Sequence, residues 1–192
     1  KYNNIQLQKF KKIKSIFKNT KLSLCNSSGI FLGSNYLFDM TRPGISIYGG
    51  YGNNRSRSMI KDVIKLKAKI IQIKKINKNE TIGYNQTYRA KKSKYIATIA
   101  IGYADGIPRI ISSKGSVYFK KYKSKILGNI SMDSTLIDIT KFYKKVKIGD
   151  YIEIINKKND IEVIAMLAKT VSQEILTSFG KRVKIHYIKW KL

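Results

Sequence analysis

The stretch "VIKLKAKIIQIKKI" (residues 63–76) alternates apolar and charged side chains over much of its length. Lysines at alternate positions fall on one face, whereas Leu66, Ala68 and Ile70 fall on the other. A period of two residues is typical of a β-strand that buries one face and exposes the other. The stretch therefore predicts the first strand of a mainly β domain.

Similar alternation returns in four later segments, which are separated by turns containing Gly, Asn, Asp or Lys. The segment "IEVIAMLAKTVSQEILTSFG" (161–180) instead has helical spacing, and "RVKIHYIKW" (182–190) returns to a strand pattern. We therefore predict a mainly β domain over about residues 58–192, with one helix near its end. The four strand segments are residues 95–106, 115–128, 134–140 and 150–156.

The amino-terminal part has a different pattern. The segment "NIQLQKFKKIKSIFK" (4–18) predicts an amphipathic helix, and "KLSLCNSSG" (21–29) predicts a strand that runs into a polar loop. A second strand and turn follow in "FDMTRPGISIYGGYGNN" (38–54). These units are typical of the end of a (β/α)8 barrel, which as a whole needs about 250 residues. We predict that residues 1–57 are the last α/β units of an incomplete (β/α)8 barrel, joined to the β-domain by "NNRSRS" (53–58).

The charge balance raises the question of a polyanionic partner. The 192 residues include 39 Lys+Arg and 11 Asp+Glu, for a formal charge of +28. Such an excess usually suggests nucleic acid or an anionic membrane. Here the lysines are scattered in short pairs along the chain, which favours a solvated basic surface and makes a nucleic-acid partner unexpected. Interleaved Lys and Tyr in "KGSVYFKKYKSK" (114–125) leave one alternative open, a non-catalytic basic β-domain that binds nucleic acid or an acidic partner.

Other compositional features concern the compartment. The single cysteine, Cys25, excludes an intramolecular disulfide and fits a reducing compartment. With one cysteine and one histidine, His186, the sequence has no zinc-ligand set. No apolar run approaches the roughly 18–20 residues that span a bilayer, so we expect a cytoplasmic protein without a membrane partner. Since the sequence begins with Lys1 and opens into structured-looking sequence, we expect it to be part of a longer chain.

Two loops of the barrel part could bind an anion. In (β/α)8 barrels a phosphate commonly binds at the loops after strands 7 and 8. Here these loops would be "NSSG" (26–29), which offers hydroxyls, and "TRPGI" (41–45), which offers a glycine beside an arginine. Spacing alone favours two ordinary βα turns over an anion site.

Five motifs, in order and at matching spacing, resemble the second half of the alanine racemases. They are "NSSGIFLGSNYLFDMTRPGISIYGG", "IGYNQTYRA", "IAIGYADGIPR", "ILGNISMDSTLIDIT" and "EILTSFGKRV", and the resemblance covers roughly residues 5–190. This resemblance implies a pyridoxal 5'-phosphate isomerase that interconverts L-alanine and D-alanine and supplies D-alanine for peptidoglycan precursors. It also implies a barrel followed by a β-domain, and a head-to-tail homodimer.

The resemblance assigns substrate roles in the β-domain. Tyr84 matches the tyrosine that acts as the base on the L face of the α-carbon. Met132 matches a residue whose backbone lies at the substrate carboxylate, with Asp133 beside it, and Tyr103 matches a residue that lines the substrate entrance. A phenol ionises near pH 10, so a tyrosine base needs neighbouring positive charge or hydrogen bonds. Tyr88 is expected to be a framing residue.

The resemblance also assigns cofactor roles. Arg42 matches the arginine that hydrogen-bonds the pyridine nitrogen, where it disfavours protonation. Ser27, Gly44 and Ile45 match positions that hold the cofactor phosphate. Tyr187 is the candidate for a final tyrosine at the phosphate, although its register is open.

The sequence departs from the family pattern at two places. The lysine that forms the Schiff base and serves as the second base lies in a family segment that has no counterpart here, so we expect this chain alone to be inactive. Whether the chain is an expressed fragment, a split or decayed gene product or a truncated record stays open. Asn129 stands where the family usually has an arginine, which changes the expected electrostatics of the entrance.

Overall fold

The computed structural model describes residues 1–51 and 56–188. Within it the chain divides into two compact units, Lys1–Val63 and Ile64–Leu192, which are described separately below. The boundary that we predicted between the barrel part and the β-domain, between residues 57 and 58, lies inside the first unit. Residues 53–55 of the predicted linker lie outside the described residues.

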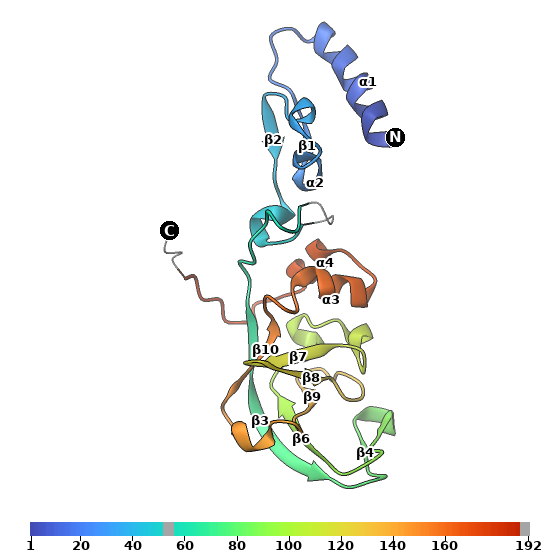
Figure 1. Cartoon of the computed structure of the whole chain (residues 1–192), viewed down its shortest axis with the longest axis vertical. Helices are drawn as coiled ribbons and strands as arrows, with labels where there is room; N and C mark the ends of the chain where they lie inside the picture. Colours follow the sequence, from blue (N-terminus) through green and yellow to red (C-terminus); the bar gives the residue numbers. More distant parts are fainter. Residues whose placement is uncertain (52–55, 189–192) are drawn as a thin grey trace. The chain divides into compact units, whose positions relative to one another are not determined.

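The amino-terminal unit contains two parallel strands joined by a helical segment. Strands β1 and β2 pair in parallel, and the connection between them holds α2 and a 3-10 helix, as in the βα units expected from the sequence (Figure 1). The preceding helix α1 confirms the helical spacing of residues 4–18. The elements are α1 (Tyr2–Ile16), β1 (Ser23–Asn26), α2 (Ser27–Ile30), η1 (Ser34–Tyr36), β2 (Met40–Arg42) and η2 (Ile45–Tyr48).

A small core holds this unit together. Cys25 on β1 is only 2% exposed, and its thiol donates a hydrogen bond to the carbonyl of Tyr36 at 2.9 Å. Phe10 of α1 packs edge-on against Phe38, with ring centroids 4.9 Å apart. Cys25 therefore packs as a small buried residue. Most apolar residues of α1 are exposed within this chain, and Leu7 is buried.

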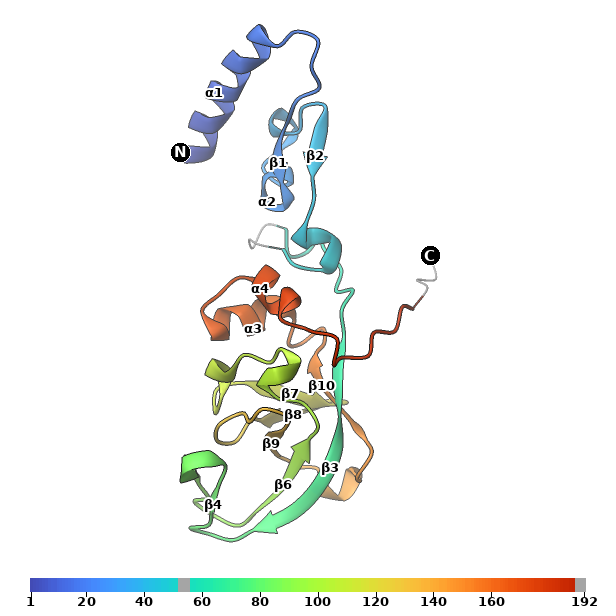
Figure 2. The ribbon, with the colours of Figure 1, turned by 180° about the vertical axis from the view of Figure 1, so that it is seen from behind.

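The carboxy-terminal unit is built on a six-stranded antiparallel sheet in the order β8-β7-β10-β3-β6-β9. The two outer strands approach each other, because Ile126 forms a bridge with Ile137 and the amide of Leu127 donates to Leu136 at 2.8 Å. The sheet is therefore nearly closed, as the curved ribbon in Figures 1 and 2 shows. Its strands are β3 (Leu66–Ile76), β6 (Lys94–Ile99), β7 (Ser116–Phe119), β8 (Tyr122–Lys125), β9 (Thr135–Asp138) and β10 (Tyr151–Ile155).

Shorter elements complete this unit. A two-stranded hairpin, β4 (Thr81–Ile82) with β5 (Tyr88–Arg89), carries η3 (Tyr84–Gln86) at its turn. Five helical segments of the described residues precede or follow the strands of the main sheet. They are η4 (Tyr103–Asp105), η5 (Arg109–Ile111), η6 (Tyr143–Lys145) and the pair α3 (Ile161–Ala168) and α4 (Ser172–Thr177).

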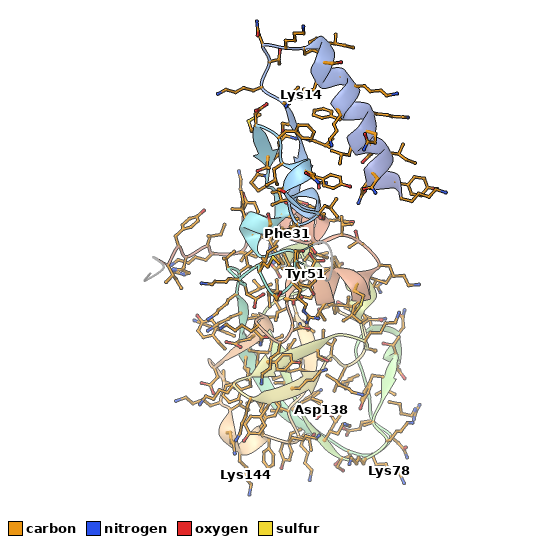
Figure 3. The ribbon with its side chains drawn as sticks, turned by 45° about the horizontal axis from the view of Figure 1, so that its top comes forward. Lys14, Phe31, Tyr51, Lys78, Asp138 and Lys144 are labelled. Carbon is orange, nitrogen blue, oxygen red and sulfur yellow. The ribbon has the colours of Figure 1, made fainter. Side chains whose placement is uncertain are left out.

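Strand β3 confirms the predicted two-faced strand. Leu66, Ala68 and Ile70 are buried, and the lysines between them are exposed. The pairing register with β6 shifts between Ile70 and Gln72, and the strict alternation of burial ends there. Figure 3 shows Lys78 and Lys144 at the periphery of this unit.

The prediction of one continuous helix over residues 161–180 is wrong. The structure has two short helices, α3 and α4, separated at Lys169, whose φ of 56° is left-handed. Thr170 and Val171 follow, and β-branched residues favour extended backbone. The second helix ends at Thr177, before Gly180.

The strand predicted over residues 182–190 is also wrong for the part that the structure describes. Residues 181–188 form no strand, and residues 189 and 190 lie outside the described residues. An alternating pattern needs a free sheet edge to pair with, and in this sheet β8 and β9 lie next to each other. Ile185 and Ile188 are consequently exposed. None of the helices in the described residues is long and apolar enough to cross a membrane.

Candidate functional site

The first group of candidate residues lies at the carboxyl ends of β1 and β2. Because the two strands are parallel, the loops that follow them lie at the same edge. The buried hydroxyl of Ser27 accepts hydrogen bonds from the amides of Gly44, at 2.8 Å, and Ser46, at 3.3 Å. The structure therefore brings Ser27 against Gly44 and Ser46, the two residues on either side of Ile45, and their role at a phosphate stays a prediction.

The surroundings of Gly44 leave room for an anion. A Cβ atom placed on Gly44 would meet only the hydroxyl of Ser27, at 3.9 Å, among the described atoms outside its immediate neighbours. While it accepts from these two amides, the Ser27 hydroxyl keeps its own hydrogen, and a hydroxyl at an open turn is a donor suited to a phosphate. These residues fit the phosphate of pyridoxal 5'-phosphate.

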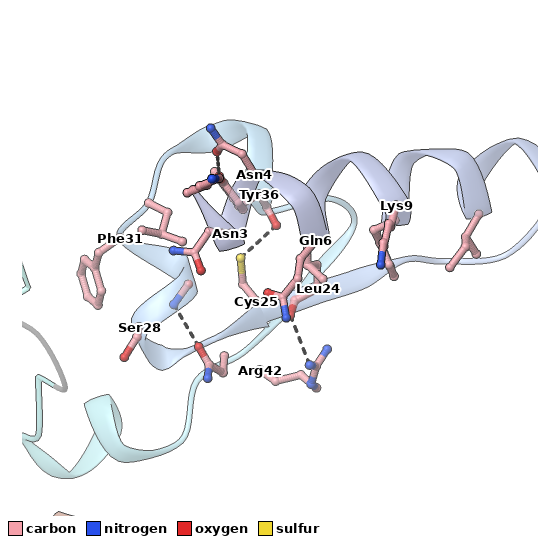
Figure 4. Close-up of a pocket in the computed structure, with 16 residues that line it drawn as sticks. Asn3, Asn4, Gln6, Lys9, Leu24, Cys25, Ser28, Phe31, Tyr36 and Arg42 are labelled. Carbon is pink, nitrogen blue, oxygen red and sulfur yellow. Dashed lines mark hydrogen bonds between the residues drawn. The ribbon is translucent and has the colours of Figure 1, made fainter.

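Arg42 ends β2 and lies across the neighbouring strand. Its Nη1 donates to the carbonyl of Ser23 at 2.9 Å and to the Ser23 hydroxyl at 2.6 Å, and its Nη2 donates to the carbonyl of Leu24 at 3.3 Å. These bonds fix the guanidinium at a pocket of ≈ 1230 Å³ in the amino-terminal unit, which Cys25 also lines (Figure 4). A guanidinium has five N–H donors, and these three bonds leave N–H groups of Arg42 that can donate to a ring nitrogen.

The same pocket sets the chemistry of Cys25. Burial raises the pKa of the Cys25 thiol, and the positive charge of Arg42 opposes that shift only in part. Cys25 is therefore held as a neutral thiol, which agrees with a packing role.

The second group of candidates lies in the carboxy-terminal unit. The amide of Tyr103 donates to the carbonyl of Ser131, and the amide of Ala104 donates to the carbonyl of Met132, both at 3.0 Å. A Cβ atom on Gly102 would stand 2.3 Å from the carbonyl oxygens of both Ser131 and Met132, so this contact requires glycine. Tyr103 and Met132 thus lie on two turns in direct contact, and both side chains are exposed.

Tyr84 lies on the turn of the neighbouring hairpin. It follows Gly83, whose φ is 78°, and its side chain is 68% exposed. A Cβ atom on Gly83 would lie 3.8 Å from the amide nitrogen of Asn129, so the turn of Tyr84 is beside the segment that leads to Met132. Tyr88 instead packs against a buried cluster that includes Ile82. Within the described contacts, the Tyr84 ring itself is not joined to Tyr103 or Met132.

Sequence reasoning assigned no role to Arg182, which contacts both turns of this second group. Its Nε lies 3.1 Å from Oδ1 of Asp105, and its Nη2 donates to Oδ1 of Asp133. The hydrogen bond with Asp133 and the charge of Asp105 raise the pKa of Arg182 above its ordinary value. The available signal was the motif "EILTSFGKRV", which contains Arg182, but the motif does not identify the acidic partners.

Tyr187 is not brought to any of these groups by a described contact. It is 94% exposed and belongs to the carboxy-terminal unit, whereas the candidate phosphate residues belong to the amino-terminal unit. His186 is also exposed, outside any described strand.

The lysine-rich segment 114–125 offers few aromatic faces to a nucleic acid. Val117, Tyr118 and Phe119 are buried in the sheet, whereas the lysines of the segment are exposed, with Lys120 over the Phe119 ring and Lys121 over the Tyr122 ring. Tyr122 is half-buried, and its hydroxyl accepts a hydrogen bond from Lys145, which lowers the pKa of Tyr122. Stacking of successive bases needs several exposed rings, which this segment does not present.

Comparisons with known proteins match both parts of the chain. The family profile described as "Alanine racemase, N-terminal domain" matches residues 1–52, and "Alanine racemase, C-terminal domain" matches residues 63–187. The alanine racemase of Rickettsia bellii is 41% identical over 97% of this chain, and that of Rhizobium meliloti is 35% identical over 97%. The matches cover 46% and 52% of those two proteins, so the chain spans about half the length of the curated relatives it matches.

Solved structures support the same relationship. The chain resembles the alanine racemase of Bartonella henselae, a structure with covalently bound pyridoxal phosphate, with a TM-score of 0.89 and 42% identity. That match covers 97% of this chain and 52% of the other. The alanine racemase of Acinetobacter baumannii matches with a TM-score of 0.86 and 31% identity, over 94% of this chain and 51% of the other. The predicted fold class, a mainly β domain preceded by the last α/β units of a barrel, is thereby confirmed, and the chain belongs to the alanine racemase family.

Proposed function

We propose that this chain is the carboxy-terminal part of a cytoplasmic alanine racemase that interconverts L-alanine and D-alanine with pyridoxal 5'-phosphate. The observation that carries the proposal is the contact between the turn of Tyr103 and the turn of Met132, made by two backbone hydrogen bonds of 3.0 Å. Family membership and the covalently bound pyridoxal phosphate of the Bartonella henselae relative support it. The product D-alanine would serve peptidoglycan precursors, as the resemblance implies.

The cofactor would be held by the amino-terminal unit. The Ser27 hydroxyl, which accepts from the Gly44 amide and keeps its own hydrogen to donate, and the amide of Ile45 would bind its phosphate where Gly44 leaves the turn open, and Arg42 would donate to its pyridine nitrogen. Because a guanidinium does not release its proton near neutral pH, Arg42 keeps that nitrogen unprotonated. When bound, the cofactor withdraws electrons from the α-carbon of alanine, which makes the α-proton removable.

The carboxy-terminal unit would supply the substrate side. The Tyr84 phenol moves the proton on the L face of the α-carbon, the backbone of Met132 meets the substrate carboxylate beside Asp133, and the half-exposed Tyr103 frames the entrance. In a head-to-tail homodimer, these residues would complete the cofactor site of the other subunit. Tyr187 as a phosphate contact remains part of the proposal, although its register stays open.

A chimera tests this function. The amino-terminal half of the Rickettsia bellii racemase, joined in frame ahead of this chain, should interconvert the alanine enantiomers and rescue growth of a strain that requires D-alanine. In this chimera Tyr84→Phe removes the hydroxyl and keeps the ring. We expect α-proton exchange from L-alanine in deuterated water to fall by about 10²–10⁴-fold, as is typical for loss of a general base. Initial exchange from D-alanine should fall less.

Tyr88→Phe is the matched control, because Tyr88 is four positions away on the same hairpin and packs against the buried cluster. Its exchange rates should stay near those of the parent chimera. Equal and small losses from both enantiomers in Tyr84→Phe, together with a lowered melting temperature, would assign Tyr84 a purely structural role and contradict the proposal.

A further inference from the structure

Three segments, distant in sequence, form one cluster near the proposed substrate entrance. The segment 102–106 carries Tyr103, the segment 131–134 carries Met132, and the segment 178–182 follows α4. The first two are joined by the amides of Tyr103 and Ala104. The third touches the first, because the hydroxyl of Ser178 donates to the carbonyl of Gly106 at 2.9 Å.

Arg182 reaches from the third segment to acidic residues on both of the others. Its Nε pairs with Asp105, two residues after Tyr103, and its Nη2 pairs with Asp133, the residue after Met132. The two carboxylates thus share one planar guanidinium. Such a fork holds two groups in a fixed relative orientation, which a single ammonium cannot do.

The two carboxylate oxygens of Asp105 have different partners. Its Oδ1 faces Arg182, and its Oδ2 accepts a hydrogen bond from the amide of Gly102 at 2.9 Å. The carboxylate therefore connects Arg182 to the start of η4, the 3-10 helix that begins with Tyr103. Since the side chain of Asp105 is only 13% exposed, its orientation is fixed by these two partners.

We infer that Arg182 is a positioning residue that ties the turn of Tyr103 to the turn of Met132. It acts through Asp105 and Asp133, and it holds the two turns in the register that their backbone hydrogen bonds require. The role of those turns at a substrate entrance rests on the proposed function, but the tie itself does not.

Amide hydrogen exchange on the full 192-residue chain tests the tie without substrate or cofactor. In Arg182→Gln, the amides of Tyr103 and Ala104 should exchange about two- to fivefold faster, the range expected for losing an exposed charge pair. The exchange rates of two other amides should not change. They are the amide of Ile70, which donates to the carbonyl of Asp150, and the amide of Ala100, which donates to the carbonyl of Lys69. Arg182→Lys should also accelerate exchange, because an ammonium lacks the planar fork that holds the two carboxylates in one relative orientation.

The matched control is Arg89→Gln, since Arg89 is an exposed arginine whose Nη1 donates to a backbone carbonyl, that of Asn79. It should leave the amides of Tyr103 and Ala104 unchanged. The Tyr103 ring gives a second signal: its fluorine resonance in 3-fluorotyrosine-labelled protein, identified with Tyr103→Phe, should shift or broaden in Arg182→Gln but not in Arg89→Gln.

Three outcomes would overturn the inference. They are unchanged exchange at Tyr103 and Ala104 in Arg182→Gln, equal acceleration across the whole sheet, and full protection in Arg182→Lys. A failure of the racemase chimera, in contrast, would leave this result intact, because neither readout involves alanine or pyridoxal phosphate.

Discussion

At the scale of single residues, the carboxy-terminal unit contains a mostly buried ion pair in a very basic chain. Lys94 on β6 contacts Asp138 on the adjacent strand β9, and both side chains are about one-fifth exposed. Burial disfavours the charge of Asp138, but hydrogen bonds from Lys94 and Thr140 outweigh it and lower the pKa below its ordinary value of 3.8. Burial likewise opposes the charge of Lys94, yet Asp138 raises the pKa of Lys94 above 10.5.

This pair predicts how stability depends on pH. Because the pKa of Asp138 is lowered by folding, its stabilising contribution is complete above about pH 4 and is lost as pH falls through the lowered value. Asp138→Asn should lower the free energy of unfolding by about 1–3 kcal/mol at pH 7, the scale of a charged hydrogen bond. Urea unfolding of both proteins from pH 7 down to pH 2 checks this, and the difference should shrink in acid.

A double-mutant cycle with Lys94→Gln separates the pair from the other contacts of Asp138. We expect the two single changes to be non-additive, since each removes the same interaction. A difference between parent and Asp138→Asn that stays constant across the acid range would show that the charge of Asp138 contributes nothing to stability.

At the scale of elements, β3 decides which side chains form the core of the sheet. Ile70 is 1% exposed and the adjacent Ile71 is 52% exposed, although both are isoleucines in the same strand. Successive side chains of a strand point to opposite faces, so Ile71 faces outward because Ile70 faces the core. The same substitution can therefore be compared at a buried and an exposed position of one strand.

The comparison predicts unequal effects of one substitution. Ile70→Ala should lower the free energy of unfolding by about 2–5 kcal/mol, because it leaves a cavity in the core. Ile71→Ala should cost well under half as much, since its side chain is half in water already. Chemical denaturation of the two variants measures both values, and similar losses would mean that the register of β3 differs from the one described.

At the scale of the whole molecule, the chain spans about half the length of the curated relatives it matches. It spans 46% and 52% of its Rickettsia and Rhizobium relatives. The base for the D face, which the resemblance places early in the barrel, belongs to the part of the relatives that this chain does not match. The proposed site therefore needs residues from outside the 192 present.

Accordingly, the purified 192-residue chain supplied with pyridoxal 5'-phosphate should not racemise alanine. Loss of one of the two bases removes proton transfer on one face of the α-carbon, and the reaction needs both faces. Conversion of L-alanine, followed by chiral chromatography, measures this, with the active chimera as positive control. Turnover by the chain alone, at a rate that rises with its concentration, would contradict the prediction.

Several elements could be predicted from the sequence by itself because they depend on local order. The period of two residues predicts β3 and the strands after it, and helical spacing predicts α1. The motifs around Ser27 and Gly44 predict two loops at one edge of a parallel pair, because the direction of parallel strands places their ends together.

The tertiary structure alone decided what depends on contacts between distant residues. The alternating residues 182–188 form no strand because β8 and β9 face each other across the bridge of Ile126 and Ile137. Arg182 and Asp133 are 49 positions apart, and nothing in the local order of either segment selects the other as its partner. Local sequence determines the period and the turns, whereas the pairing of edges and charges depends on which segments the folded chain brings within a few ångströms.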